Sequence, residues 1–126
     1  MVLGFQLPNT LCQSPFDLRV SPYYWEVSIA SQRWLDHSQC PKGEGRADIV
    51  RLKAGLLASM CYPTVDRGQL RVCSDFVNFL FYIKSLANIA DVETVSELAD
   101  IVLNTLCEPQ RPTDNNLSYT ARKCVH

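Results

Sequence analysis

The segment DRGQLRVCSDFVNFLFYIKSLANIA, which runs from Asp66 to Ala90, decides the fold of this chain. It predicts one long helix over residues 66–90, because apolar residues recur on nearly every side of a 3.6-residue turn. Such a helix is normally central in a bundle and needs neighbours all round it. The helices expected elsewhere in the chain can supply only part of that cover. The side chains expected to stay incompletely covered are Phe76, Phe79, Leu80 and Phe81.

A first helix is predicted to begin at Ser21 and to end near His37. Ser21 is a good N-cap, and Pro22 fits the first helical position, where no N–H is needed. One face of this helix collects residues at helical spacing. They are Tyr24, Val27, Ser28, Ser31, Trp34 and Leu35.

Two more helices complete the pattern. One is expected over residues 47–61, where Gly55 permits close packing. Another is expected over residues 94–106, where Thr94 and Glu97 are spaced as a capping box. No strand pattern is present, so the expected class is all-α with about four helices.

Composition excludes several classes of function. The chain has 126 residues, is 47% hydrophobic and carries a net charge of −1, which suits one globular domain and gives no basic field for nucleic acid. Packing explains the aromatic residues near the first helix, Trp25 and Trp34 among them, better than base stacking does. No apolar run approaches a membrane span, and nothing signals secretion, so a cytoplasmic location is expected.

Six cysteines are present, and none of them forms a C-x-x-C pair of the kind found in zinc or redox sites. Cys61, Cys73 and Cys107 lie among apolar neighbours and are predicted to be small buried thiols.

Several short pieces, in this order and spacing, resemble class I terpene synthases, most closely the sesquiterpene synthases of basidiomycete fungi. They are FQLP over 5–8, RVSPYY over 19–24, GLLA over 55–58 with Tyr62-Pro63, and QLRVCSDFVNFLF over 69–81. The resemblance implies a partial class I terpenoid synthase bundle, truncated to its N-terminal portion. Residues 1–20 are then an N-terminal arm that lies on something else, residues 21–108 the truncated helical domain, and residues 109–126 an irregular tail.

In that family the run ending at Phe81 leads into an Asp-Asp-x-x-Asp motif that binds Mg²⁺ and so neutralises the substrate diphosphate. Here the corresponding residues are Lys84-Ser85-Leu86-Ala87-Asn88, and all three carboxylates are absent. The family's second metal motif, on a late helix, has no counterpart either. The resemblance therefore implies an inactive homologue with no catalytic, cofactor-binding or metal-ligating residues, and prenyl diphosphate binding is not expected.

Nearby acids do not replace the motif. Asp75 precedes Lys84 by nine residues, which turns it to the opposite helix face. Asp91 and Glu93 are two residues apart and are expected to be helix-start charges.

Four alternatives stay open. Lys84 could act as a reactive amine or bind diphosphate directly with its own charge. The chain could be part of an active synthase that cyclises farnesyl diphosphate with acids supplied from elsewhere. It could also be a helical interaction protein whose exposed apolar faces dock on a partner such as an intact synthase, or on a second copy of itself.

Overall fold

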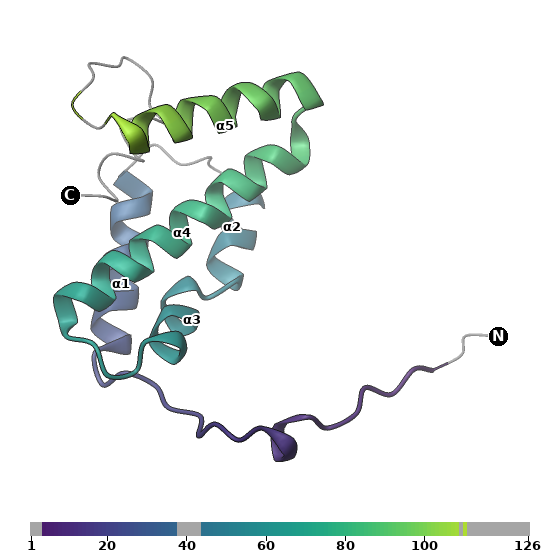
Figure 1. Ribbon diagram of the computed structural model, residues 1–126, viewed down its shortest axis with the longest axis vertical. Coiled ribbons are helices and arrows are strands. Elements are labelled where there is room, and N and C mark those ends of the chain that lie inside the picture. Colours follow the sequence, from purple (N-terminus) through teal and green to yellow (C-terminus); the bar gives the residue numbers. More distant parts are fainter. Residues whose placement is uncertain (1–3, 38–43, 109, 111–126) are drawn as a thin grey trace.

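The computed structural model describes residues 4–37, 44–108 and 110. For Leu11, Glu44 and Gly45 only the backbone is described. These residues form five α-helices and one 3₁₀ turn, with no strand among them (Figure 1). The all-α class is therefore confirmed. None of the helices in the described ranges combines the length and apolar content needed to cross a bilayer. The predicted tail over 109–126 lies outside the described residues, apart from residue 110.

Helix α1 spans Tyr24–His37 and begins two residues later than a start at Pro22 would place it. The reason is a turn, in which the Tyr24 N–H donates to the Ser21 carbonyl at 3.1 Å and the Tyr23 N–H donates to Ser21 Oγ at 3.3 Å. The predicted inner face is confirmed, since Val27, Ser31 and Leu35 are buried.

The prediction of a single helix over residues 47–61 is wrong. The chain forms α2, Glu44–Arg51, and α3, Ala54–Cys61, on either side of Lys53, which has a left-handed backbone with φ 49° and ψ 53°. This conformation costs a non-glycine residue roughly 1–2 kcal/mol. The break lets each short helix bury its own side chains, Ile49 against Leu35 and Ala58 against Val27.

Helix α4, Arg67–Ile89, is central, because it packs against each of the other four helices. Its start is fixed by a capping box in which Asp66 and Gln69 accept from each other's backbone N–H groups.

The expected incomplete cover of α4 is confirmed for Phe76 and Leu80, which are exposed, whereas Phe81 is half-buried. It is wrong for Phe79, which is only 1% exposed, because Trp34 of α1 and residues of the fifth helix pack over it.

That fifth helix, α5, spans Val92–Cys107, and its N-cap is Asp91 rather than Thr94. The Asp91 carboxylate accepts from the Thr94 N–H at 2.9 Å, so the N-cap lies three residues before the predicted one and the predicted capping box at Thr94 is wrong. The expectation that Asp91 and Glu93 are helix-start charges is confirmed. The inner side chains of α5 that pack on Phe79 are Leu98, Ile101 and Val102.

Small and polar side chains form the seam between α1, α3 and α4. Asn78 Nδ2 donates to Ser31 Oγ at 2.8 Å, and both residues are buried. A Cβ atom on Gly55 would lie 1.8 Å from Ser28 Oγ and 2.9 Å from Ser28 Cα. The predicted role of Gly55 in close packing is therefore confirmed, since α1 and α3 touch where it stands.

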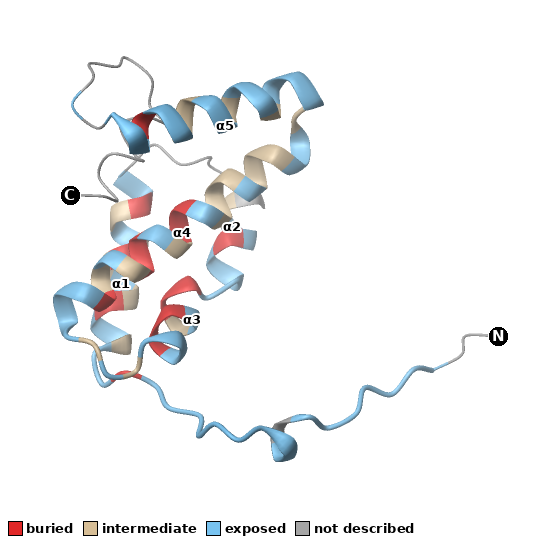
Figure 2. Ribbon diagram, viewed as in Figure 1, coloured by how far each residue is buried: buried red, intermediate tan, exposed pale blue. Residues whose placement is uncertain are grey.

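The surface holds two further corrections (Figure 2). Cys61 and Cys107 are exposed, so the prediction of buried thiols is wrong for both. Cys73 is half-buried and packs against the core cluster of Val27, Ala58 and Leu70. Trp34 is half-buried as expected, whereas Trp25 is 70% exposed. Residues 4–10 and 12–20 of the arm are exposed, and the arm leads away from the helices (Figure 1).

Candidate functional site

The last turns of α4 carry Lys84, Ser85 and Asn88, the positions where the resemblance predicts the acidic motif. Lys84 and Asn88 are exposed, and Ser85 is half-buried. Lys84 and Asn88 lie four residues apart and so share one side of the helix. The site therefore offers an ammonium group, a carboxamide and a hydroxyl group. This set of donors does not fit Mg²⁺, which takes oxygen ligands and favours carboxylates.

Two of the acids that flank these positions in the sequence are engaged elsewhere. Asp75 is buried and accepts two hydrogen bonds from Arg71 Nε, at 2.8 and 3.0 Å. Asp91 caps α5, and hydrogen bonds from the Thr94 side chain and backbone hold the pKa of its carboxyl below the ordinary value of 3.8. Within the described ranges, no three His, Cys, Asp or Glu residues come together in a way that could hold a metal ion.

An apolar row leads along α4 to Lys84. Val72, Phe76 and Leu80 precede Lys84 at four-residue intervals and are 52%, 42% and 46% exposed. The sequence pattern predicted incomplete cover for Phe76 and Leu80 but not for Val72, and it did not show that the three exposed side chains would form a row.

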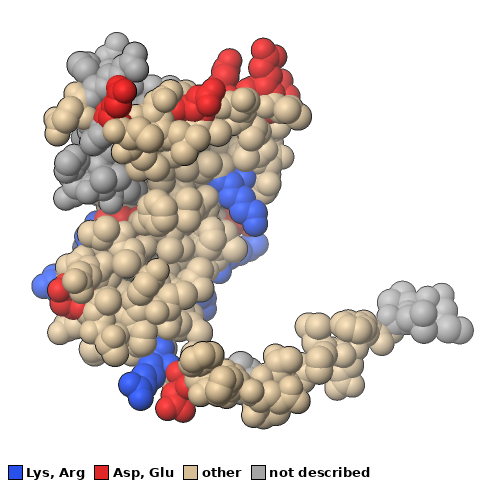
Figure 3. Space-filling view, in the orientation of Figure 1, with Lys and Arg blue, Asp and Glu red and all other residues tan. Residues whose placement is uncertain are grey.

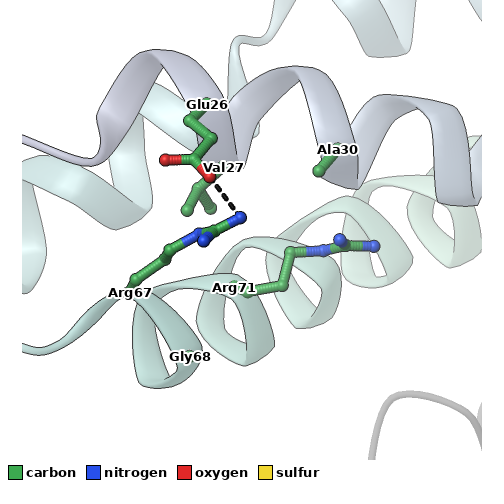
Figure 4. Close-up of a pocket in the computed structure, with 6 residues that line it drawn as sticks. All are labelled: Glu26, Val27, Ala30, Arg67, Gly68 and Arg71. Atoms are coloured by element: carbon green, nitrogen blue, oxygen red, sulfur yellow. Dashed lines mark ion pairs between the residues drawn. The ribbon is translucent and has the colours of Figure 1, made fainter.

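A pocket of about 320 Å³ lies between α1 and the first turns of α4 (Figure 4). Its lining residues are Glu26, Val27, Ala30, Arg67, Gly68 and Arg71. Glu26 and Arg67 form an ion pair across it, and Arg71 is held by Asp75. Each guanidinium group is thus balanced by a carboxylate of this chain, which makes the pocket a poor receptor for a diphosphate.

This pocket was not predicted from the sequence. The four-residue spacing of Arg71 and Asp75 is a signal for an ion pair on one helix. Nothing in the local sequence indicates that Glu26 and Arg67 meet, because they lie on different helices.

A second pocket, of about 300 Å³, lies between α1 and α2. Its wall includes Trp25 and Tyr24, whose rings meet edge to face at a centroid distance of 5.9 Å, together with Lys53 at the helix break. It holds no acidic side chain, and it shares no residue with the motif positions on α4.

The fold is that of a partial terpene synthase helical bundle, and the chain is similar to known sesquiterpene synthases of fungi. Alpha-muurolene synthase of Coprinopsis cinerea is 37% identical over 114 residues, which are 87% of this chain and 27% of that protein. A sesquiterpene synthase of Cyclocybe aegerita is 35% identical over 82% of this chain and 30% of its own length. Sesquiterpene synthase 3 of Postia placenta is 34% identical over 93% of this chain and 32% of its own length.

This chain is therefore a homologue of the fungal sesquiterpene synthases, matched over most of its own residues. It spans about three tenths of the length of these relatives. No protein-family model matches the sequence.

Proposed function

We propose that this chain is a sesquiterpene synthase-like protein without cyclase activity. The proposal is supported by the presence of Lys84, Ser85 and Asn88 near the end of α4, where the resemblance predicts the family's acidic motif. The catalytic and metal-ligating residues of the family have no equivalent at these positions, and the proposal includes no cofactor.

Electrostatics supports this proposal. At about 4 Å and an effective dielectric constant near 20, an ammonium group and a divalent cation repel each other by roughly 8 kcal/mol. Lys84 is exposed and can turn its head group away, which lowers this cost. Even then, only a hydroxyl group and a carboxamide remain as ligands, so the Mg²⁺ that would neutralise a substrate diphosphate is not retained.

The proposal places the chain in the cytoplasm. Four cysteines among the described residues are free thiols: Cys12, Cys61, Cys73 and Cys107. Free thiols are typical of a reducing compartment.

A second candidate function is that of an interaction protein, and the uncovered row of Val72, Phe76 and Leu80 favours it. Such a row suits an apolar helix of another protein, for example an intact synthase. Co-purification with an active relative would distinguish this function from a protein that only lost its activity.

The direct test is incubation of the purified chain with farnesyl or geranyl diphosphate and Mg²⁺ or Mn²⁺. We expect neither a terpene product nor released diphosphate above a heat-killed control. A metal-dependent product above that control would refute the proposal.

A rescue experiment separates lost ligands from lost architecture. The triple change Lys84→Asp, Ser85→Asp and Asn88→Asp should stay inactive in the 126-residue chain, because the acidic motif supplies only one wall of a closed site. Joined to the downstream helices of an active relative, the same triple change should restore some diphosphate release. The matched control is that chimera with Lys84→Gln alone, which removes the positive charge without adding a carboxylate and should stay inactive. A triple variant that turns over substrate by itself would overturn our interpretation of the fold.

A further inference from the structure

The pocket between α1 and α2 differs from the pocket between α1 and α4 in the charge of its wall. Lys53 is the one charged residue among the described residues that line it. In the pocket between α1 and α4, by contrast, Arg67 is paired with Glu26, and Arg71 is paired with Asp75. A wall with a single uncompensated cation is complementary to an anionic ligand.

Lys53 has no carboxylate partner in the described part of the chain. The acidic side chains described on α1 and α2 are each paired with an arginine. The pairs are Glu26–Arg67, Asp36–Arg46 and Asp48–Arg51. Helix α3, which follows Lys53, has no acidic residue. On the face drawn in Figure 3, acidic side chains gather along α5, which contributes nothing to this pocket. The ammonium group of Lys53 is therefore available to a ligand.

The rest of the wall is largely apolar and stays in contact with water. Trp25, Ile29 and Val50 line the pocket and are 70%, 40% and 40% exposed. Trp25 and Ile29 lie four residues apart on α1 and so share one side of that helix. The Trp25 ring meets the Tyr24 ring edge to face, which leaves less freedom for the indole group. Exposed apolar side chains that gather around a pocket are typical of a binding site.

We propose that this pocket binds a small aromatic carboxylate, that is, a planar apolar ring system with one negative charge. The ring packs against Trp25, Ile29 and Val50, and the carboxylate pairs with Lys53, whose flexible four-carbon stem can bring the ammonium group over the pocket. A volume of about 300 Å³ is at the lower end of the range for ligand pockets and suits one or two rings.

The charge of the site selects a singly charged ligand over a diphosphate. One ammonium group balances one carboxylate, whereas a diphosphate would keep uncompensated charge beside apolar side chains, which is costly. The pocket shares no residue with Lys84, Ser85 or Asn88. This binding therefore does not depend on whether the chain is catalytically active.

The test is a titration of the full chain with naphthoate at neutral pH, followed through the indole N–H signals of its two tryptophans in proton–nitrogen NMR spectra. The Trp25 signal should shift and reach saturation. The Trp34 signal should stay in place, because Trp34 packs in the core against Phe79. Naphthamide has the same rings without the charge, and it should bind about fivefold more weakly, since an ion pair near the surface contributes a factor of this order.

Variants assign the two parts of the interaction. Lys53→Gln should bind naphthoate and naphthamide equally, because it removes the ammonium group and keeps a side chain of similar length. Arg51→Gln is the matched control, since Arg51 is an exposed cation two residues away that does not line the pocket, and this variant should keep the fivefold preference. Trp25→Ala should weaken both ligands about tenfold, measured on the backbone amide signal of Ile29. Trp25 is 70% exposed, so its removal leaves the core intact.

Three results would overturn the proposal. One is a Trp25 signal that does not move up to the solubility limit of naphthoate. Another is equal binding of naphthoate and naphthamide by the wild-type protein. The third is an Arg51→Gln variant that loses the preference as fully as Lys53→Gln does, because net charge and not the pocket would then attract the ligand.

Discussion

Replacing Gly55 with alanine tests the close approach of α1 and α3. The added Cβ would lie 1.8 Å from Ser28 Oγ, 2.8 Å from Ser28 Cβ and 2.9 Å from Ser28 Cα. A serine hydroxyl group could rotate away, but the Cα atom belongs to the backbone of α1. The two helices must therefore move apart, and the packing of Ala58 against Val27 loosens with them.

The magnitude follows from two opposing effects. Overpacking a tightly packed position costs about 1–3 kcal/mol, and a clash that includes backbone belongs at the upper end. Alanine gains about 1 kcal/mol over glycine in a helix interior. We expect a net loss of about 2 kcal/mol in the free energy of unfolding, roughly a 30-fold change in the folding equilibrium.

The assay is urea denaturation followed by far-ultraviolet circular dichroism, with protein concentration held constant because self-association would add to stability. Gly68→Ala is the matched control. Gly68 is exposed in the first turn of α4, and a Cβ there meets only Asp66 Oδ1 at 3.3 Å. This variant should gain up to about 1 kcal/mol.

Ser28→Gly should rescue Gly55→Ala only in part, because it removes the Oγ and Cβ atoms but leaves the clash with the backbone of α1. If Gly55→Ala were as stable as the wild-type protein with an unchanged denaturant slope, α1 and α3 could not be packed as closely at Gly55 as described above.

Three further predictions concern the core, the start of α5 and the state of the isolated chain. Ser31→Ala removes the acceptor of the buried Asn78 amide and should lower the free energy of unfolding by about 1–3 kcal/mol in the same urea assay, and no loss would mean that the amide finds another partner. The pKa of Asp91 is lowered in the folded chain, so its stabilising effect is complete above pH 3.8 and is lost as the pH falls through the folded value. Amide exchange in α5 should accordingly rise in acid, and Asp91→Asn, which keeps an acceptor oxygen without the titration, should remove this local pH dependence. Because large side chains of α4 stay uncovered, the far-ultraviolet helix signal should survive heating better than the near-ultraviolet aromatic signal, and a sharp cooperative transition in a monomer would contradict this.

The start of α4 could be predicted from the sequence, because Asp66 and Gln69 act on their own turn. The break at Lys53 could not, because lysine is a good helix former and no glycine or proline stands at that position. What decides the break is tertiary packing, since Ile49 must reach Leu35 while Ala58 reaches Val27. Intrinsic preference is too weak to oppose such packing.

The same distinction applies to the site. The assignment of Lys84, Ser85 and Asn88 to the motif positions rests on the residues that precede them in the linear sequence, and it stays a prediction. The ion pair of Glu26 with Arg67 could not be predicted, since it depends on how α1 crosses α4. The exposure of Cys61 and Cys107 was likewise hidden, because apolar neighbours in sequence do not fix which side of a helix faces the core.

The left-handed residue at Lys53 also has a consequence for the order of folding. It divides one stretch of chain into two helices of eight residues each, and isolated helices shorter than about 12–15 residues are marginal in water. Helix α4, with 23 residues, is well above that length. We therefore expect α4 and α1 to form the folding nucleus and α2 and α3 to be added late. Substitutions at Leu70 would then slow folding, whereas substitutions at Ile49 would mainly speed unfolding.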